Sequence, residues 1–311
     1  MGKVIAVASQ KGGVGKTTTA INLSACAAED GKRVLLVDID PQGNAASGLG
    51  VSVDESCPTL YEVLVSGLPV EEAIQKEVLP NLDVLPSGQK LSGAEVELVG
   101  MMARETRLRH ALESIREQYD FVFVDCPPSL GLLTVNTLTA ADSVLIPLQC
   151  EYYALEGLTQ LVRTIQLVQE NLNPSLRIEG VLLTMFDTRL NLSQQVADEA
   201  RKFFSDRVYR TVIPRNVRLS EAPSFGKPII HYDGTSTGAD SYRALAQEVM
   251  QLDTSLGLPQ EQPRDQAQEQ PEDQDHQAQV RPPDNTQEQT QAQNQDQAQD
   301  QAQDHEVIQH D

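Results

Sequence analysis

The sequence predicts an α/β fold, a mostly parallel, twisted sheet with helices on both faces. Short apolar runs suited to buried strands alternate along the chain with longer segments of helical periodicity. Alternation of this kind favours parallel strands joined by crossover helices. Ligands of such sheets bind at the carboxyl ends of the strands, and polar segments follow several of the expected strands here.

Each expected strand rests on a short apolar run, and each expected helix on a one-sided apolar pattern. The first strand, 4–8, runs into a glycine-rich loop, and the helix after it keeps Ala20, Leu23 and Ala27 on one face before Gly31. The remaining strands are expected at 33–38, 81–85, 121–125, 143–148, 178–184 and 208–213. Helices are expected at 17–28, 101–118, 155–170, 193–204 and 240–252.

The end of the chain differs in composition from the rest. Residues 259–311 hold 13 Asp/Glu and two Arg, which gives −11 of the net charge of −21. This segment is mainly Gln, Asp, Glu, Ala and Pro, and it has too few apolar side chains to offset the entropy lost on ordering. We therefore expect one folded domain at 1–257 and an acidic, Gln-rich disordered tail at 258–311.

Composition also limits the classes of function. The first 258 residues still carry −10, so any nucleic-acid binding needs a local basic patch rather than bulk positive charge. The four cysteines include no C-x-x-C pair, which favours buried thiols in a reducing compartment. No leader peptide and no apolar run of about 20 residues is present, so we expect a soluble, cytoplasmic protein that does not enter a membrane.

The strongest motif is the loop Lys11-Gly12-Gly13-Val14-Gly15-Lys16-Thr17-Thr18. The general phosphate-binding pattern is G-x-x-x-x-G-K-[ST], but its first glycine is replaced by Gln10 and a second lysine follows. The glycines allow backbone amides to surround phosphate, Lys16 supplies positive charge, and the Thr17 hydroxyl suits Mg²⁺. The loop predicts a P-loop NTPase that uses ATP and Mg²⁺.

Two acidic segments follow other strands. Asp38 and Asp40 flank Ile39 and would point the same way on an extended chain, where they suit Mg²⁺ coordination or the positioning of water. Asp125 ends the run 121–125, which fits an acid that binds Mg²⁺ directly or through water. We therefore predict Thr17, Asp40 and Asp125 as the metal site.

A basic stretch lies late in the folded part. Residues 201–227 hold seven Arg/Lys and two Asp/Glu, a local charge of +5 that suits contacts to phosphates without sequence preference. Before it stands the segment 185–189, and within it Pro214 fixes the backbone while the amide of Asn216 can hydrogen-bond an adenine edge.

These segments together resemble the ParA/Soj chromosome-partitioning ATPases of the ParA/MinD superfamily, and the likeness covers about residues 2–252. It implies ATP contacts along 11–18 and at Pro214 and Asn216, with Lys11, Lys16 and Asp40 in catalysis. It also implies that Lys11 reaches the active site of a second subunit, so that two ATP molecules are sandwiched in a homodimer. Arg189 and Arg218 would face DNA.

The resemblance implies an ATP-hydrolysing DNA-partitioning switch. The ATP-bound dimer would bind DNA non-specifically on the nucleoid, and a ParB-like activating protein would stimulate hydrolysis and release. One alternative is a nucleotide-dependent regulator of replication initiation or polar positioning. Another is a MinD-like membrane-cycling ATPase, which needs a basic amphipathic C-terminal helix where this chain is acidic. An iron–sulfur carrier would need paired interface cysteines that Cys126 and Cys150 do not provide.

Overall fold

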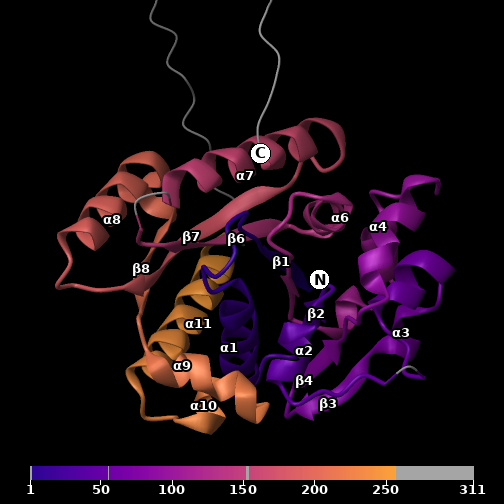
Figure 1. Cartoon of the computed structure of the whole chain (residues 1–311), viewed down its shortest axis with the longest axis horizontal. Helices are drawn as coiled ribbons and strands as arrows, with labels where there is room; N and C mark the ends of the chain where they lie inside the picture. The colour runs from indigo at the N-terminus through magenta and orange to yellow at the C-terminus, as the bar shows by residue number, and fades with distance from the viewer. Residues whose placement is uncertain (1, 55, 152–153, 257–311) are drawn as a thin grey trace, which may run out of the picture. The chain divides into compact units, whose positions relative to one another are not determined.

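The computed structural model describes residues 2–54, 56–151 and 154–256, and in this part of the chain the strands form one eight-stranded sheet (Figure 1). The strand order is β3-β4-β2-β5-β1-β6-β7-β8, and all neighbours are parallel except β3 and β4. The prediction of a mostly parallel sheet is confirmed. The strands are β1 (Lys3–Val7), β2 (Val34–Asp38), β3 (Gln75–Leu79), β4 (Leu82–Leu85), β5 (Phe121–Asp125), β6 (Ser143–Gln149), β7 (Arg177–Phe186) and β8 (Val208–Pro214).

The sheet is covered by helices that differ widely in length. The α-helices are α1 (Lys16–Glu29), α2 (Asn44–Gly48), α3 (Val70–Ala73), α4 (Leu91–Val99), α5 (Arg107–Glu113), α6 (Leu132–Ala140), α7 (Ala154–Asn171), α8 (Asn191–Phe204), α9 (Val217–Glu221), α10 (Ile229–Tyr232) and α11 (Thr237–Leu256). A π-helical turn covers Glu62–Ser66, and 3-10 turns cover Arg116–Gln118, Ser205–Arg207 and Ala222–Phe225. No helix among the described residues is long and apolar enough to cross a membrane.

Each face of the sheet has its own hydrophobic core, because successive side chains of a strand point to opposite faces. In β5, Phe121 and Phe123 pack in the core that α1, α2, α10 and α11 cover. Val122 and Val124 pack in the other core, against α4, α5, α6, α7 and α8. Figure 1 shows α7 and α8 on one side of the sheet and α1 and α11 on the other. The prediction of helices on both faces is therefore confirmed.

The prediction of one long helix at 101–118 is wrong. The backbone turns between α4 and α5, with Ala103 at a φ of 53°, and α5 begins at Arg107. The buried amide of Asn136, from α6, lies where a continuous helix would bond Leu108 to Arg104. Its Nδ2 donates to the Arg104 carbonyl at 2.7 Å, and its Oδ1 accepts from the Leu108 amide at 3.3 Å. A side chain 28 residues further along the chain therefore takes over one helical hydrogen bond.

The other expected elements match observed ones to within a few residues. Several observed elements had no counterpart in the sequence interpretation: the edge strand β3, with exposed Lys76 and Glu77, and the helices α2, α3, α4, α6, α9 and α10. Of these helices, α4 buries Leu91, Ala94 and Leu98 on one face. The spacing of those three α4 side chains is a helical signal that could have been found. The expected tail, 258–311, lies outside the described residues.

Candidate functional site

The three polar segments predicted after separate strands lie together. Because β2, β5 and β1 are neighbours in the sheet, Asp38 is in register with Asp125, and Val7 with Asp125. The glycine-rich loop follows β1 directly and leads into α1. The carboxyl ends of three adjacent parallel strands thus bring the loop and the acids to one edge, where ligands of such sheets bind.

The glycine-rich loop has a backbone that glycine favours. Gly13 has a φ of 73° and Gly15 of 88°, and Gly15 is the N-cap of α1. A side chain added at Gly12 or Gly13 would meet no other atom within 4 Å, so the space in front of the loop is open. The first turn of α1 contains no acidic residue. Free amides and the positive end of a helix dipole form an anion-binding cradle.

Lys16, at the start of α1, is a buried cation in this cradle. Only 6% of it is exposed, and its Nζ donates to the Lys11 carbonyl at 3.1 Å. Burial lowers the pKa of Lys16, and the charges of Asp125 and Asp40 oppose that shift. An anionic ligand would supply the counter-charge that a buried ammonium favours.

The two acids of β2 and its following loop differ in what they contact. Asp38 is fully buried, and its Oδ2 accepts from the first-turn amides of α2, at 2.9 Å from Ala45 and 3.0 Å from Ala46. Burial raises the pKa of Asp38 to about 7 despite the hydrogen bond from the Ala46 amide. Asp40 is 8% exposed and accepts from the Gln42 amide at 3.0 Å. Asp38 therefore anchors α2, and Asp40 begins the loop that faces solvent.

Asp125 is the least compensated acid of the three. It is fully buried, and neither carboxylate oxygen has a hydrogen-bond partner among the described residues. Burial, followed by the charge of Asp38, raises the pKa of Asp125 well above its ordinary value, although the Thr17 hydroxyl and the charge of Lys16 oppose that shift. Such an arrangement fits a site that a cation completes, directly or through water.

The fit to Mg²⁺ depends on ligands from outside the chain as well. Among the described residues, no group of three or more His, Cys, Asp or Glu could hold a metal ion alone. Mg²⁺ usually takes one or two carboxylates together with water and substrate phosphates. Thr17, Asp40 and Asp125 match that donor set, and the orphaned carboxylate of Asp125 is the observation that favours it.

The extra lysine has a partner within the same chain. The Nζ of Lys11 lies 2.9 Å from Oε2 of Glu151, in the segment after β6, and both side chains are partly exposed. The sequence interpretation gave Glu151 no role, because its contact with Lys11 depends on the fold and not on nearby sequence. The ion pair places Lys11 at the surface of the loop, where another molecule can reach it.

A cavity of about 140 Å³ adjoins the glycine-rich loop. Gly15 and Thr18 line it together with Pro214 and Asn216, so the structure brings these predicted residues together. Asn216 is the N-cap of α9: its Oδ1 accepts from the Arg218 amide at 2.8 Å, and its Nδ2 donates to Thr237 Oγ1 at 2.9 Å. One amide hydrogen and one lone pair stay available for a ligand.

The two arginines predicted to face DNA are exposed and paired. Nη2 of Arg189 lies 2.7 Å from Oδ2 of Asp187. The hydrogen bonds from Arg189, aided by the charge of Arg215, lower the pKa of Asp187 to about 2. Arg218 lies 2.9 Å from Glu221 and 3.5 Å from Asp233. All seven basic residues of 201–227 are exposed: Arg201, Lys202, Arg207, Arg210, Arg215, Arg218 and Lys227.

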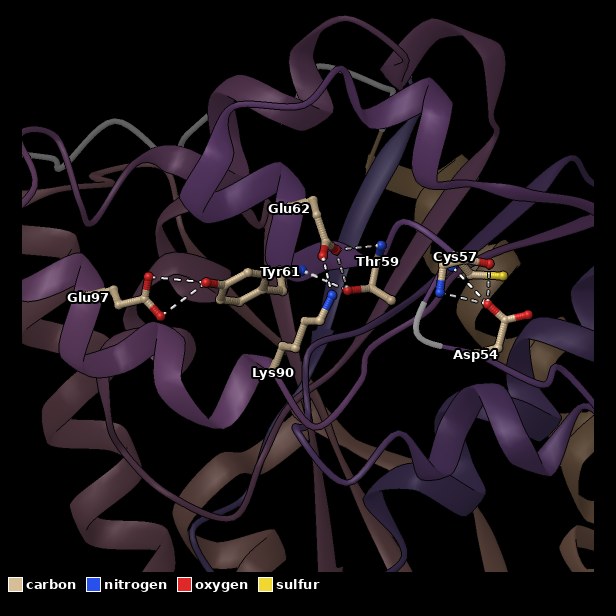
Figure 2. Close-up of polar contacts among 8 residues, drawn as sticks. Asp54, Cys57, Thr59, Tyr61, Glu62, Lys90 and Glu97 are labelled. Carbon is tan, nitrogen blue, oxygen red and sulfur yellow. Dashed lines mark hydrogen bonds and ion pairs between the residues drawn. The ribbon is translucent and has the colours of Figure 1, made fainter.

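A larger cavity, of about 560 Å³, is lined in part by the loop after β2. Figure 2 shows the polar contacts of one wall. Glu62 Oε2 accepts from the amide and the hydroxyl of Thr59, each at 2.9 Å, while its Oε1 lies 3.2 Å from Lys90. The Tyr61 hydroxyl donates to Glu97 of α4 at 3.1 Å. These bonds fix the turn Glu62–Ser66 against α4. Thr59 and Glu62 have the T-x-x-E spacing of a capping box, a signal that the sequence interpretation did not use.

The chain is similar to proteins of known families. A protein-family model described as an AAA domain matches residues 2–178. Sporulation initiation inhibitor protein Soj of Bacillus subtilis is 61% identical over 249 residues, 80% of this chain and 98% of that protein. Chromosome partitioning protein ParA of Myxococcus xanthus is 58% identical over 254 residues, 82% of this chain and 90% of that protein. The solved structure of cobyrinic acid a,c-diamide synthase from Mycobacterium smegmatis, with bound ADP and magnesium, has a TM-score of 0.72 and 38% identity over 82% of this chain and 96% of that chain.

Replacement of the uncompensated acid tests the electrostatics of the site. We expect Asp125→Asn to raise the melting temperature of the nucleotide-free protein at pH 7 by about 2–4 °C, because it removes a buried charge. The gain should grow as the pH rises from about 4, since the unfolded carboxyl then ionises before the folded one. Thermal melts by circular dichroism between pH 4 and 8 measure both effects.

The matched control is Asp120→Asn, because the hydrogen bond from Arg33 lowers the pKa of Asp120. Its carboxylate contributes stability above the ordinary pKa of an aspartate, and that contribution is lost as the pH falls. This variant should therefore be no more stable than the parent at pH 7. An Asp125→Asn protein whose melting temperature is unchanged or lower at every pH would contradict the uncompensated charge.

Proposed function

The chain belongs to the ParA/Soj family of chromosome-partitioning ATPases, and on that premise we propose that it is an ATP-hydrolysing switch for DNA segregation. The observation that carries the proposal is the meeting of an anion cradle, the buried Lys16 and the unpartnered Asp125 at one sheet edge. The neighbour with bound ADP and magnesium has a different named activity at 38% identity. Relatives at 61% and 58% identity favour partitioning instead.

In this proposal the phosphates of ATP lie in the loop 11–18, where glycine amides and Lys16 neutralise their charge. Thr17, Asp125 and Asp40 would hold Mg²⁺, which would offset the negative charge of the phosphates. Asp40 stands at the start of a solvent-facing loop and would support the attack of water. The base would enter the cavity beside Pro214 and Asn216.

Pairing of two copies accounts for the second lysine. Lys11 and Glu151 are 37% and 46% exposed at their side chains, so water screens their ion pair, which contributes at most about 1 kcal/mol. Phosphate oxygens of an ATP bound to a second copy would attract the same ammonium more strongly. We propose that ATP binding exchanges the Glu151 contact for one across a homodimer, with two nucleotides sandwiched between the subunits.

The basic residues of 201–227, together with Arg189, form the proposed DNA-binding surface. Seven exposed cations against two acids concentrate positive charge on a chain whose net charge is −21. The Arg218 pairs with Glu221 and Asp233 are exposed, so exchange of these carboxylates for DNA phosphates costs little. Such contacts recognise the backbone of DNA and carry no sequence information.

The remaining parts of the proposal concern partners and location. A ParB-like protein would stimulate hydrolysis and thereby release the dimer from DNA, and the working location would be the nucleoid in the cytoplasm. A role in replication initiation or polar positioning would use the same nucleotide switch. We also propose that the ATPase domain ends near 257 and that the acidic tail, 258–311, is not needed for hydrolysis. Loss of ATPase activity on truncation after residue 257 would contradict that boundary.

The two lysines of the loop should separate nucleotide binding from pairing. We expect Lys16→Ala to weaken ATP binding about 10- to 100-fold, because a charge-assisted contact to phosphate is lost. Lys11→Ala should keep ATP binding and lose ATP-dependent dimerisation. Titration with a fluorescent ATP analogue and light scattering with and without ATP measure these effects.

The control for both substitutions is Lys32→Ala. Lys32 lies just before the amino end of β2, whereas the loop lies at the carboxyl ends of the strands. It should leave nucleotide binding and dimerisation unchanged. Unaltered ATP affinity in Lys16→Ala would overturn the assignment of the phosphate cradle, and a dimer that forms normally in Lys11→Ala would overturn the proposed role of that lysine.

The proposed DNA-binding surface should make the affinity for DNA depend on salt. We expect Arg218→Ala to weaken binding to random-sequence DNA in the ATP state and to lower the slope of log affinity against log salt by about 1. Arg177→Ala removes the same charge from the exposed amino end of β7 and is the matched control. Fluorescence anisotropy across a salt series measures both affinities. If the two substitutions weaken DNA binding equally, DNA does not bind at the surface around Arg218.

A further inference from the structure

A buried threonine from a distant strand contacts the glycine-rich loop. The Thr184 hydroxyl, near the end of β7, donates to the Val14 carbonyl at 2.8 Å, although the two residues are 170 positions apart. Both residues are 2% exposed. Nothing in the motif analysis pointed to Thr184, because its role depends on the strand order and not on the sequence near the loop.

The sheet fixes where that hydroxyl lies. Thr184 is in register with Gln149 of β6, and the Thr184 carbonyl accepts from the Cys150 amide at 3.3 Å. On its other side, the Thr184 side chain lies 3.9 Å from the point where a side chain at Gly15 would begin. A hydroxyl held by a paired strand and packed against the loop has little freedom to move.

The consequence for the loop follows from peptide geometry. In a trans peptide the carbonyl and the amide of the next residue point in opposite directions. A donor that holds the Val14 carbonyl therefore sets the direction of the Gly15 amide. Without that donor, the peptide could turn and present a carbonyl oxygen, which repels an anion, in place of an amide that binds it.

A second brace acts at the other end of the loop, where Lys16 Nζ donates to the Lys11 carbonyl at 3.1 Å. The Lys16–Lys11 and Thr184–Val14 hydrogen bonds should respond differently to a bound anion. Phosphate competes for the Lys16 ammonium, whereas the Thr184 hydroxyl is buried behind the loop and keeps its contact. Thr184 also lines the cavity that holds Pro214 and Asn216, so one side chain touches both the loop and the cavity beside it.

We propose that Thr184 is a positioning residue for phosphate binding: its hydroxyl holds the Val14 carbonyl so that the Gly15 amide faces the anion. The inference rests on the proposed function, because it takes a nucleotide phosphate as the anion. Immediately after Thr184, Met185 has a φ of 49°, an uncommon backbone for a residue with a side chain. The strand is therefore irregular just after the threonine, before it ends at Phe186.

The test uses the full chain with two substitutions of Thr184. Thr184→Val keeps the volume and removes the hydroxyl, while Thr184→Ser keeps the hydroxyl and removes a methyl group. We expect the valine variant to bind Mg·ADP about tenfold more weakly, measured by calorimetry at a temperature where every variant is folded, and the serine variant to bind near the parent value. In the ¹⁵N-labelled parent and serine variant, the Gly15 amide resonance should move on addition of Mg·ADP, and in the valine variant it should move much less.

The outcomes separate this inference from the function on which it rests. Unchanged Mg·ADP affinity in Thr184→Val, with Lys16→Ala still impaired, would overturn the positioning role and leave the phosphate cradle intact. Equal losses in the valine and serine variants would show that packing volume matters and the hydroxyl does not, which also overturns it. Failure of the parent to bind Mg·ADP would instead overturn the proposed function.

Discussion

Burial of charge at the carboxyl ends of β1, β2 and β5 is the constraint on which the rest of this structure depends. One lysine and three aspartates lie at this edge with little exposure to water, and burial is the largest cause of the pKa shifts of Lys16, Asp38 and Asp125. An isolated buried charge is costly, so groups that persist there need partners. Asp38 finds them in the amides of α2, whereas Asp125 finds none among the described residues.

That contrast separates a structural acid from a binding one. Asp38 contributes to the fold because it fixes the first turn of α2, and it therefore fixes the loop that begins with Asp40. Asp125, by contrast, costs folding free energy because it is buried without a hydrogen-bond partner among the described residues, and its proposed role is to bind a cation. The glycine-rich loop is similar in this respect. Amides without partners at the start of α1 destabilise the free protein, but they can donate hydrogen bonds to a bound anion. In the proposed function, Mg²⁺ and phosphate would supply the partners that these groups lack in the free protein.

Much of the fold and the main site could be predicted because their causes are local in sequence. The apolar runs and the lysine-rich loop identified the strands and the cradle, and strand order then brought Asp40 and Asp125 to that cradle. The failures have tertiary causes. Asn136, from another element, interrupts the helix expected at 101–118. Glu151 and Thr184 reach the loop only because β6 lies beside β1 and β7 lies beside β6. No spacing near those residues indicates what they contact.

The central claim is that nucleotide controls the affinity of this chain for DNA, and the most direct measurement is binding to random-sequence DNA across a salt series with ATP, with ADP and without nucleotide. We expect tight binding with ATP, a steep loss of affinity as salt rises, and binding at least about tenfold weaker in the other two states. Equal affinity in all three states would contradict the switch. A salt dependence near zero in the ATP state would contradict the basic surface as the site of contact.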